Sequence, residues 1–115
     1  MAYDQGLAQR IREAMADELG LSEREMFGGI GFMLNGNMAC GVIGEDLMVR
    51  VGADRYQEAL DQPGVRLFDM TGRPMKGWIV VDGGVAAEDD AFGNWVAWGV
   101  ETARGLPAKA KVKKA

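Results

Sequence analysis

Three cations have types and positions that suit the binding of an anion. Arg50 alternates with the apolar residues of an expected strand, so its side chain should point away from the apolar face. Arg73 and Lys76 flank Pro74 in an expected loop. Together the three would form a small anion-binding site or contact the carboxylates of a partner, because guanidinium and ammonium groups bind anions strongly. Loop charges that are merely solvated would give the same pattern.

Trp98 is a second candidate for recognition. It lies about 60° from the apolar stripe of an expected C-terminal helix, at roughly 100° per residue. That stripe contains Phe92, Trp95 and Val96. Because tryptophan is enriched at protein interfaces, Trp98 is a candidate anchor for a partner. Half-buried packing at the edge of the stripe remains the other interpretation.

The side chains on which most enzymes depend are scarce. The chain has no histidine and one cysteine. A Ser-His-Asp or Cys-His unit, an imidazole metal ligand and a cysteine-built zinc or iron–sulfur site are therefore excluded. We expect no catalytic residue, no metal site, no cofactor and no enzyme activity. Cys40 alternates with Met38 and Val42 in an expected strand, and we predict that it is a buried apolar residue.

A cluster of glycines resembles a phosphate-binding loop only at first sight. Gly28, Gly29 and Gly31 would need a further glycine at position 34, followed directly by a helix. The chain has Leu34 there and continues into Asn35-Gly36, the strongest short signal for a β-hairpin. We therefore predict a strand in which Gly29 and Gly31 share one sheet face, where another segment can approach closely.

Charge is distributed unevenly along the chain. With 13 basic and 17 acidic residues the net charge is −4, and without the four lysines at positions 109–114 it would be −8. An acidic body repels nucleic acid, whose binding depends on phosphate neutralisation. The basic tail is expected to be solvated and disordered, with weak DNA contact as the alternative. The acidic residues 88–90 are expected to complement the dipole of a helix that begins there.

The length and the lone Cys40 indicate one small cytoplasmic domain. The 115 residues suffice for a single core, which we place in residues 1–107, with a tail over 108–115. No apolar run approaches the roughly 18 residues of a membrane span, and the N-terminus lacks the pattern of a secretory signal. A single cysteine fits a reducing compartment.

Hydrophobic periodicity predicts an α+β fold with the order α-βββ-α-ββ-α. In this prediction a two-layer arrangement places helices on one face of a five-stranded antiparallel sheet. The expected helices cover residues 4–19, 54–60 and 88–104, and the expected strands cover 26–34, 37–43, 47–51, 65–70 and 78–81.

In this order the segments resemble a known family. Five segments are similar to those of stand-alone TfoX/Sxy N-terminal-domain proteins of bacteria. They are the opening strand 26–33, the hairpin 35–42, the strand 47–52, the loop 71–78, and the Trp95 helix with the Leu106-Pro107-Ala108-Lys109 segment at its end. The resemblance covers nearly the whole chain. It implies a secretion-chaperone-like, two-layer fold and supplies no catalytic motif. Full-length members regulate natural competence, are thought to assist a cyclic-AMP-responsive transcription factor, and carry a second, helical domain.

We therefore expect a regulatory module that binds a protein, either a second copy in a homodimer or a transcription-related factor. Membrane binding is not expected. One alternative is a binder of small anions, or a minor enzyme, on the open sheet face near Gly29, Gly31, Arg50, Arg73 and Lys76. The other is weak DNA binding through the lysine-rich tail.

Overall fold

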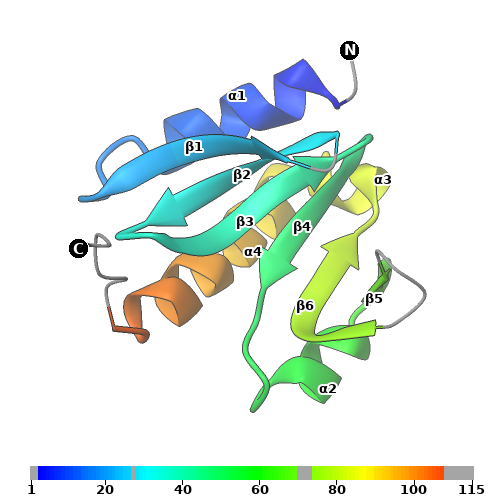
Figure 1. Ribbon diagram of the computed structural model, residues 1–115. Helices are drawn as coiled ribbons and strands as arrows, with labels where there is room; N and C mark the ends of the chain where they lie inside the picture. The colour runs from blue at the N-terminus through cyan, green and yellow to red at the C-terminus, as the bar shows by residue number, and fades with distance from the viewer. Residues whose placement is uncertain (1–2, 27, 70–73, 108–115) are drawn as a thin grey trace.

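The computed structural model describes residues 3–26, 28–69 and 74–107, which form an antiparallel sheet of six strands with helices on one face (Figure 1). The sheet order is β1-β2-β3-β4-β6-β5. In chain order the elements are α1 (Gln5–Ala14), β1 (Leu21–Met26), β2 (Gly29–Leu34), β3 (Asn37–Ile43), β4 (Asp46–Arg50), α2 (Tyr56–Leu60), β5 (Val65–Asp69), β6 (Pro74–Val81), α3 (Gly83–Ala86) and α4 (Asp89–Arg104).

The expected α+β class and the helices on one face are confirmed, but the expected number of strands is wrong. The strand predicted over 26–34 is divided between β1 and β2, which pair antiparallel from Leu21 opposite Leu34 to Met26 opposite Gly29. Gly28 has a φ of 76°, which glycine adopts without strain and which lets the chain reverse there. β1 was missed because its middle residues are charged, as is common for a strand at the edge of a sheet.

Helix α1 begins where expected and ends earlier. The Asp4 side chain accepts a hydrogen bond from the Leu7 backbone N–H (3.0 Å) and caps its start. The predicted end at Leu19 is wrong because the apolar stripe stops at Met15, which is fully buried, while Leu19 is 80% exposed. The remaining turn of the expected helix would bury no apolar side chain.

The boundaries of the other elements differ in smaller ways. α4 begins within a residue of its predicted start, whereas β6 begins four residues before the predicted Trp78. α3 was not predicted, because Gly83-Gly84 was interpreted as a break in the chain. Asp82 makes this short helix possible, since its carboxylate accepts the Gly84 backbone N–H (2.9 Å).

The main core lies between the sheet and the helices. In Figure 1, α4 runs behind β3 and β4, and α1 lies next to α4 and packs against β3. Alternate side chains of each strand point into this layer, among them Phe32, Leu47, Val49, Ile79 and Val81, which are fully buried. The end of α4 is fixed to β3 by Asn37, whose buried side-chain amide donates to the Pro107 carbonyl (2.8 Å).

A bulge in β3 changes the face that one predicted residue occupies. Phe32 pairs with Cys40 and Met33 pairs with Met38, so Ala39 is an extra residue on β3. Ala39 and Cys40 therefore both point into the core, whereas Met38 points to the opposite face. The predicted burial of Cys40 is confirmed, but its predicted alternation with Met38 is wrong. Burial raises the pKa of the Cys40 thiol to about 12.

Candidate functional site

The face of the sheet opposite the helices is the candidate site, and we call it the open face. Cross-strand partners point to the same side of a sheet, so the strand register places one continuous row of residues across it. From β1 to β5 this row is Arg24, Gly31, Gly41, Met48, Val80 and Arg66. The prediction that Gly29 and Gly31 share a face agrees with this register, since the residues between and after them, Ile30 and Phe32, lie in the core.

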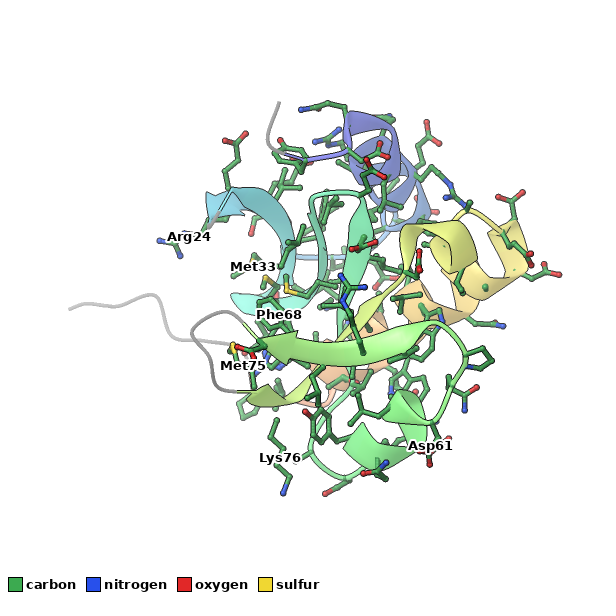
Figure 2. The ribbon with its side chains drawn as sticks, turned by 90° about the vertical axis from the view of Figure 1, so that its right-hand side faces the viewer. Arg24, Met33, Asp61, Phe68, Met75 and Lys76 are labelled. Atoms are coloured by element: carbon green, nitrogen blue, oxygen red, sulfur yellow. The ribbon has the colours of Figure 1, made fainter. Side chains whose placement is uncertain are left out.

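The open face carries its own apolar cluster. Met48, Phe68 and Val80 are buried there, and three half-buried side chains pack against them, namely Met38, Ile43 and Trp78. Figure 2 shows Arg24, Met33, Phe68 and Met75 on the side of the molecule away from α1 and α4. In the described part of the chain no helix covers this cluster, so its outer side chains remain available for contact.

A cavity of about 690 Å³ adjoins the cluster at strand β5. Most of its lining is apolar, with one cation and one carboxylate. The lining residues are Ile43, Leu60, Val65, Arg66, Leu67, Phe68, Asp69 and Val80. The open face thus combines a buried apolar centre with a concave margin, which suits the binding of another chain.

Arg50 lies at the edge of this cluster with weak partners. Its guanidinium carbon is 5.0 Å from the centre of the Trp78 ring, and its Nη1 donates to the Met38 carbonyl over 3.4 Å. No carboxylate among the described residues forms an ion pair with it. Burial lowers the pKa of Arg50, because partial removal from water disfavours the charged form. A carboxylate brought to this position would replace the lost hydration.

The other cations differ in their availability. Arg66 pairs with Asp46 (2.6 Å), whereas Arg24 is exposed and forms no ion pair with the carboxylates that the structure describes. Lys76 projects away from Met75 and Phe68 in Figure 2.

The alternation in β6 changes at Gly77, whose φ is 92°. Neither polar contact that the structure gives Arg50 involves Lys76, and a shared anion-binding site of these two cations stays a prediction. The third predicted cation, Arg73, lies outside the described residues, as does the lysine tail.

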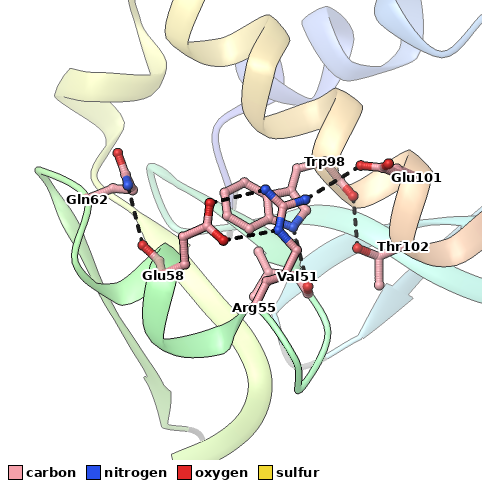
Figure 3. Close-up of polar contacts among 7 residues, drawn as sticks. All are labelled: Val51, Arg55, Glu58, Gln62, Trp98, Glu101 and Thr102. Atoms are coloured by element: carbon pink, nitrogen blue, oxygen red, sulfur yellow. Dashed lines mark hydrogen bonds and ion pairs between the residues drawn. The ribbon is translucent and has the colours of Figure 1, made fainter.

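Trp98 lies on the helix side of the sheet, across from Arg50. Its ring stacks on Trp95 with centroids 5.1 Å apart and planes 6° apart, and the Arg55 guanidinium sits 3.9 Å from its centre. Figure 3 shows Arg55 held over the ring by Glu58 (3.2 Å) and Glu101 (3.7 Å). This arrangement gives Trp98 a packing role, and its use as a partner anchor stays a prediction.

The Trp98 indole also forms a hydrogen bond from α4 to the residue that follows β4. Removing this bond tests the packing role. Its Nε1–H donates to the Val51 carbonyl (3.3 Å). Trp98→Phe keeps a stacked ring and loses this bond, so we expect a loss of about 1 kcal/mol in the free energy of unfolding. Urea denaturation followed by circular dichroism measures it. Trp78→Phe on the open face is the matched control, and an equal loss in both variants would contradict the assignment.

A smaller cavity of about 310 Å³ lies beside this stack. It is formed where the α2–β5 loop meets α4, and its lining is mostly apolar. The lining residues are Gln62, Pro63, Val85, Ala91, Asn94, Trp95 and Trp98. None of these lining residues is charged. The nearby Arg55 is already paired with Glu58 and Glu101.

Two residues of the open face were missed by sequence reasoning. Trp78 stands opposite Arg50 through the pairing of β4 with β6, which lie on either side of α2 and β5 in the chain. No local pattern reports that pairing. Arg24 was missed because β1 itself was not predicted. Residues 21–26 show no alternation of apolar and polar side chains, so the sequence held no local signal for this strand.

Within residues 3–26, 28–69 and 74–107, no group of three histidine, cysteine or acidic side chains is arranged to hold a metal ion. None of the helices in these ranges is both long and apolar enough to cross a bilayer.

Comparison with known protein families gives a match over most of the chain. A family model described as the TfoX N-terminal domain matches residues 12–103. This range includes every strand, α2, α3 and nearly all of α4. No curated protein and no solved structure matches the chain significantly.

Proposed function

The chain belongs to the TfoX N-terminal domain family, and from this premise we propose that it is a non-catalytic regulatory domain that binds another protein through its open face. The observation that carries the proposal is the apolar cluster around Met48, Phe68 and Val80, over which the described chain places no helix. Binding of a partner to such a surface is favourable, because it removes the outer apolar side chains from water and so lowers the free energy of the complex.

The composition of the open face supports protein binding. An apolar centre with a polar, charged margin is the usual anatomy of a protein interface. Trp78 and Arg50 belong to the residue types that contribute most to binding energy at such surfaces. Met33 and Met38 add flexible side chains that can adjust to a partner.

The partner we propose is a different protein rather than a second copy. A second copy would offer the unpaired cations Arg24 and Arg50 a surface that carries the same cations, so charge complementarity favours a different partner. The association of full-length relatives with competence makes a transcription-related protein the first class to examine. The proposal also places the domain in the cytoplasm, where its single free cysteine stays reduced.

Site-specific photo-crosslinking in cells tests the docking face. A benzophenone side chain at exposed Ser22, in the strand position opposite Met33, should give a discrete adduct with another protein. The same group at exposed Ala97 on α4 is the control and should give none. The double change Met33→Gln and Met38→Gln should abolish the adduct from position 22, with folding checked by circular dichroism.

Two outcomes would contradict the proposal. Equal adducts from positions 22 and 97, or an adduct that survives the double change, would remove the open face as the docking surface. An adduct containing only a second copy of this chain would show that the partner is the chain itself.

A further inference from the structure

We propose that the segment bound by the open face is an amphipathic helix with acidic residues beside its apolar stripe, one of whose carboxylates pairs with Arg50. The inference rests on the proposed function and specifies the chemistry of the partner. It is carried by the charge of the open face, by the weak partners of Arg50 and by the strand register.

A segment bound to the open face has to form its backbone hydrogen bonds within itself. The backbone groups of its inner strands are already paired with their neighbours, so the face presents side chains. An extended segment lying on these side chains would leave its own N–H and C=O groups without partners. A helix pairs these groups internally, and α1 and α4 already pack on the other face of the same sheet.

The charges of the open face select an acidic helix. Among the described residues Asp46 is engaged by Arg66 and by the Gly83 backbone N–H, whereas Arg24 and Arg50 form no ion pair. Asp69, at the β5 margin, also forms no ion pair there, so the two free arginines face one free carboxylate. A carboxylate that reaches Arg50 gains a charge-assisted hydrogen bond beside the Trp78 ring. It also relieves the cost of holding a cation partly out of water. A basic helix would meet like charge at both arginines.

The register sets the length of the bound helix. Arg24 and Arg66 stand on the two edge strands, at opposite ends of one row across the sheet. With roughly 4.8 Å between strands, the row is about 24 Å long. A helix rises 1.5 Å per residue, so about 16 residues span it. The middle of the row is occupied by Gly31, Gly41 and Met48, where small and flexible side chains let a helix approach.

Selection from a displayed library tests the inference without a known partner. The immobilised full chain is presented with random 16-residue peptides in a helix-favouring background, and the enriched sequences are read. We expect aspartate and glutamate to be enriched beside apolar positions at helical spacing. The best peptide is then synthesised and its dissociation constant is measured by fluorescence anisotropy.

Variants of the chain assign the acidic contact to Arg50. Arg50→Gln should raise the dissociation constant of the peptide about tenfold, because one charge-assisted hydrogen bond is lost. Arg50→Glu should reverse the preference, binding a version of the peptide with lysine at the contacting position better than the original. Lys76→Gln is the matched control, since Lys76 is exposed and projects away from Met75 and Phe68 in Figure 2, and it should change affinity less than about twofold. Circular dichroism confirms that each variant is folded.

The outcomes separate this inference from the proposed function. The acidic helix is wrong if the enriched peptides show no excess of acidic residues. It is also wrong if Arg50→Gln and Arg50→Glu leave peptide binding unchanged. In either case the docking face stands, provided that the double change Met33→Gln and Met38→Gln abolishes binding. If none of these changes affects the selected peptides, the docking face is wrong as well. Loss of affinity with added salt in the wild type but not in Arg50→Gln would further support the ion pair.

Discussion

Gly99→Ala is expected to lower the free energy of unfolding by about 2 kcal/mol, the cost of overfilling a close-packed interior. Gly99 is buried in α4 at the point where this helix crosses β3. A Cβ atom there would press on the Ala39 carbonyl oxygen and would also lie 3.1 Å from the carbonyl carbon. Both are backbone atoms, so α4 would have to move away from the sheet. Urea denaturation followed by circular dichroism measures the effect.

Gly93→Ala is the matched control because it makes the same chemical change in the same helix. Gly93 is exposed, and a Cβ atom there would meet nothing within 4 Å. This variant should be more stable than the wild type by about 0.5–1 kcal/mol, since alanine favours a helix over glycine. If both variants are stabilised, then α4 does not pack against β3 as closely as the structure indicates.

The pH dependence of stability should reveal the burial of Cys40. The thiol has a raised pKa of about 12 in the folded chain, against about 8.5 in an unfolded one. Below pH 8.5 both states hold the proton, and the thiol adds no pH dependence. Above it the unfolded state ionises first, so folding stability falls as the pH rises. The loss should reach about 2.7 kcal/mol by pH 10.5, two pH units above the pKa of the unfolded thiol.

Comparison with Cys40→Ala isolates the contribution of the thiol from that of tyrosines and lysines. Between pH 8 and pH 10.5 the stability difference between the two proteins should shift by about 2.5 kcal/mol in favour of the variant. Urea denaturation at each pH under reducing conditions gives this difference. A constant difference across the range would mean that the thiol ionises as freely in the folded chain as in the unfolded one.

These two predictions concern the helix side of the sheet, whereas the proposed binding uses the other side. Gly99 and Cys40 belong to the large core beneath α1 and α4. Met48, Phe68 and Val80 belong to a separate, smaller cluster. Changes to the outer residues of the open face should therefore affect binding more than folding, because they lie outside the main core.

Local sequence patterns were sufficient for elements that are defined by their own neighbours. The stripe of Phe92, Trp95 and Val96 predicted α4, and Asn35-Gly36 predicted the β2–β3 hairpin. Asn35 has a φ of 53° and Gly36 of 85°, the left-handed geometry that these residue types favour in a tight turn. Cys40 was predicted to be buried from its alternation with Met38 and Val42, and it is buried even though the bulge breaks the alternation with Met38. In each case the controlling contacts lie within a few residues of one another.

Only the tertiary structure decided which distant residues meet. The pairing of β4 with β6 places Arg50 beside Trp78, and the bulge at Ala39 turns Met38 to the open face. The sheet separates Arg50 from Trp98, two candidates that the sequence left unplaced. Alternation along a strand tells which residues share a face, but it does not tell which strands are neighbours or where an extra residue shifts the alternation. Those depend on the free energy of closing the whole sheet over its core, to which every strand contributes.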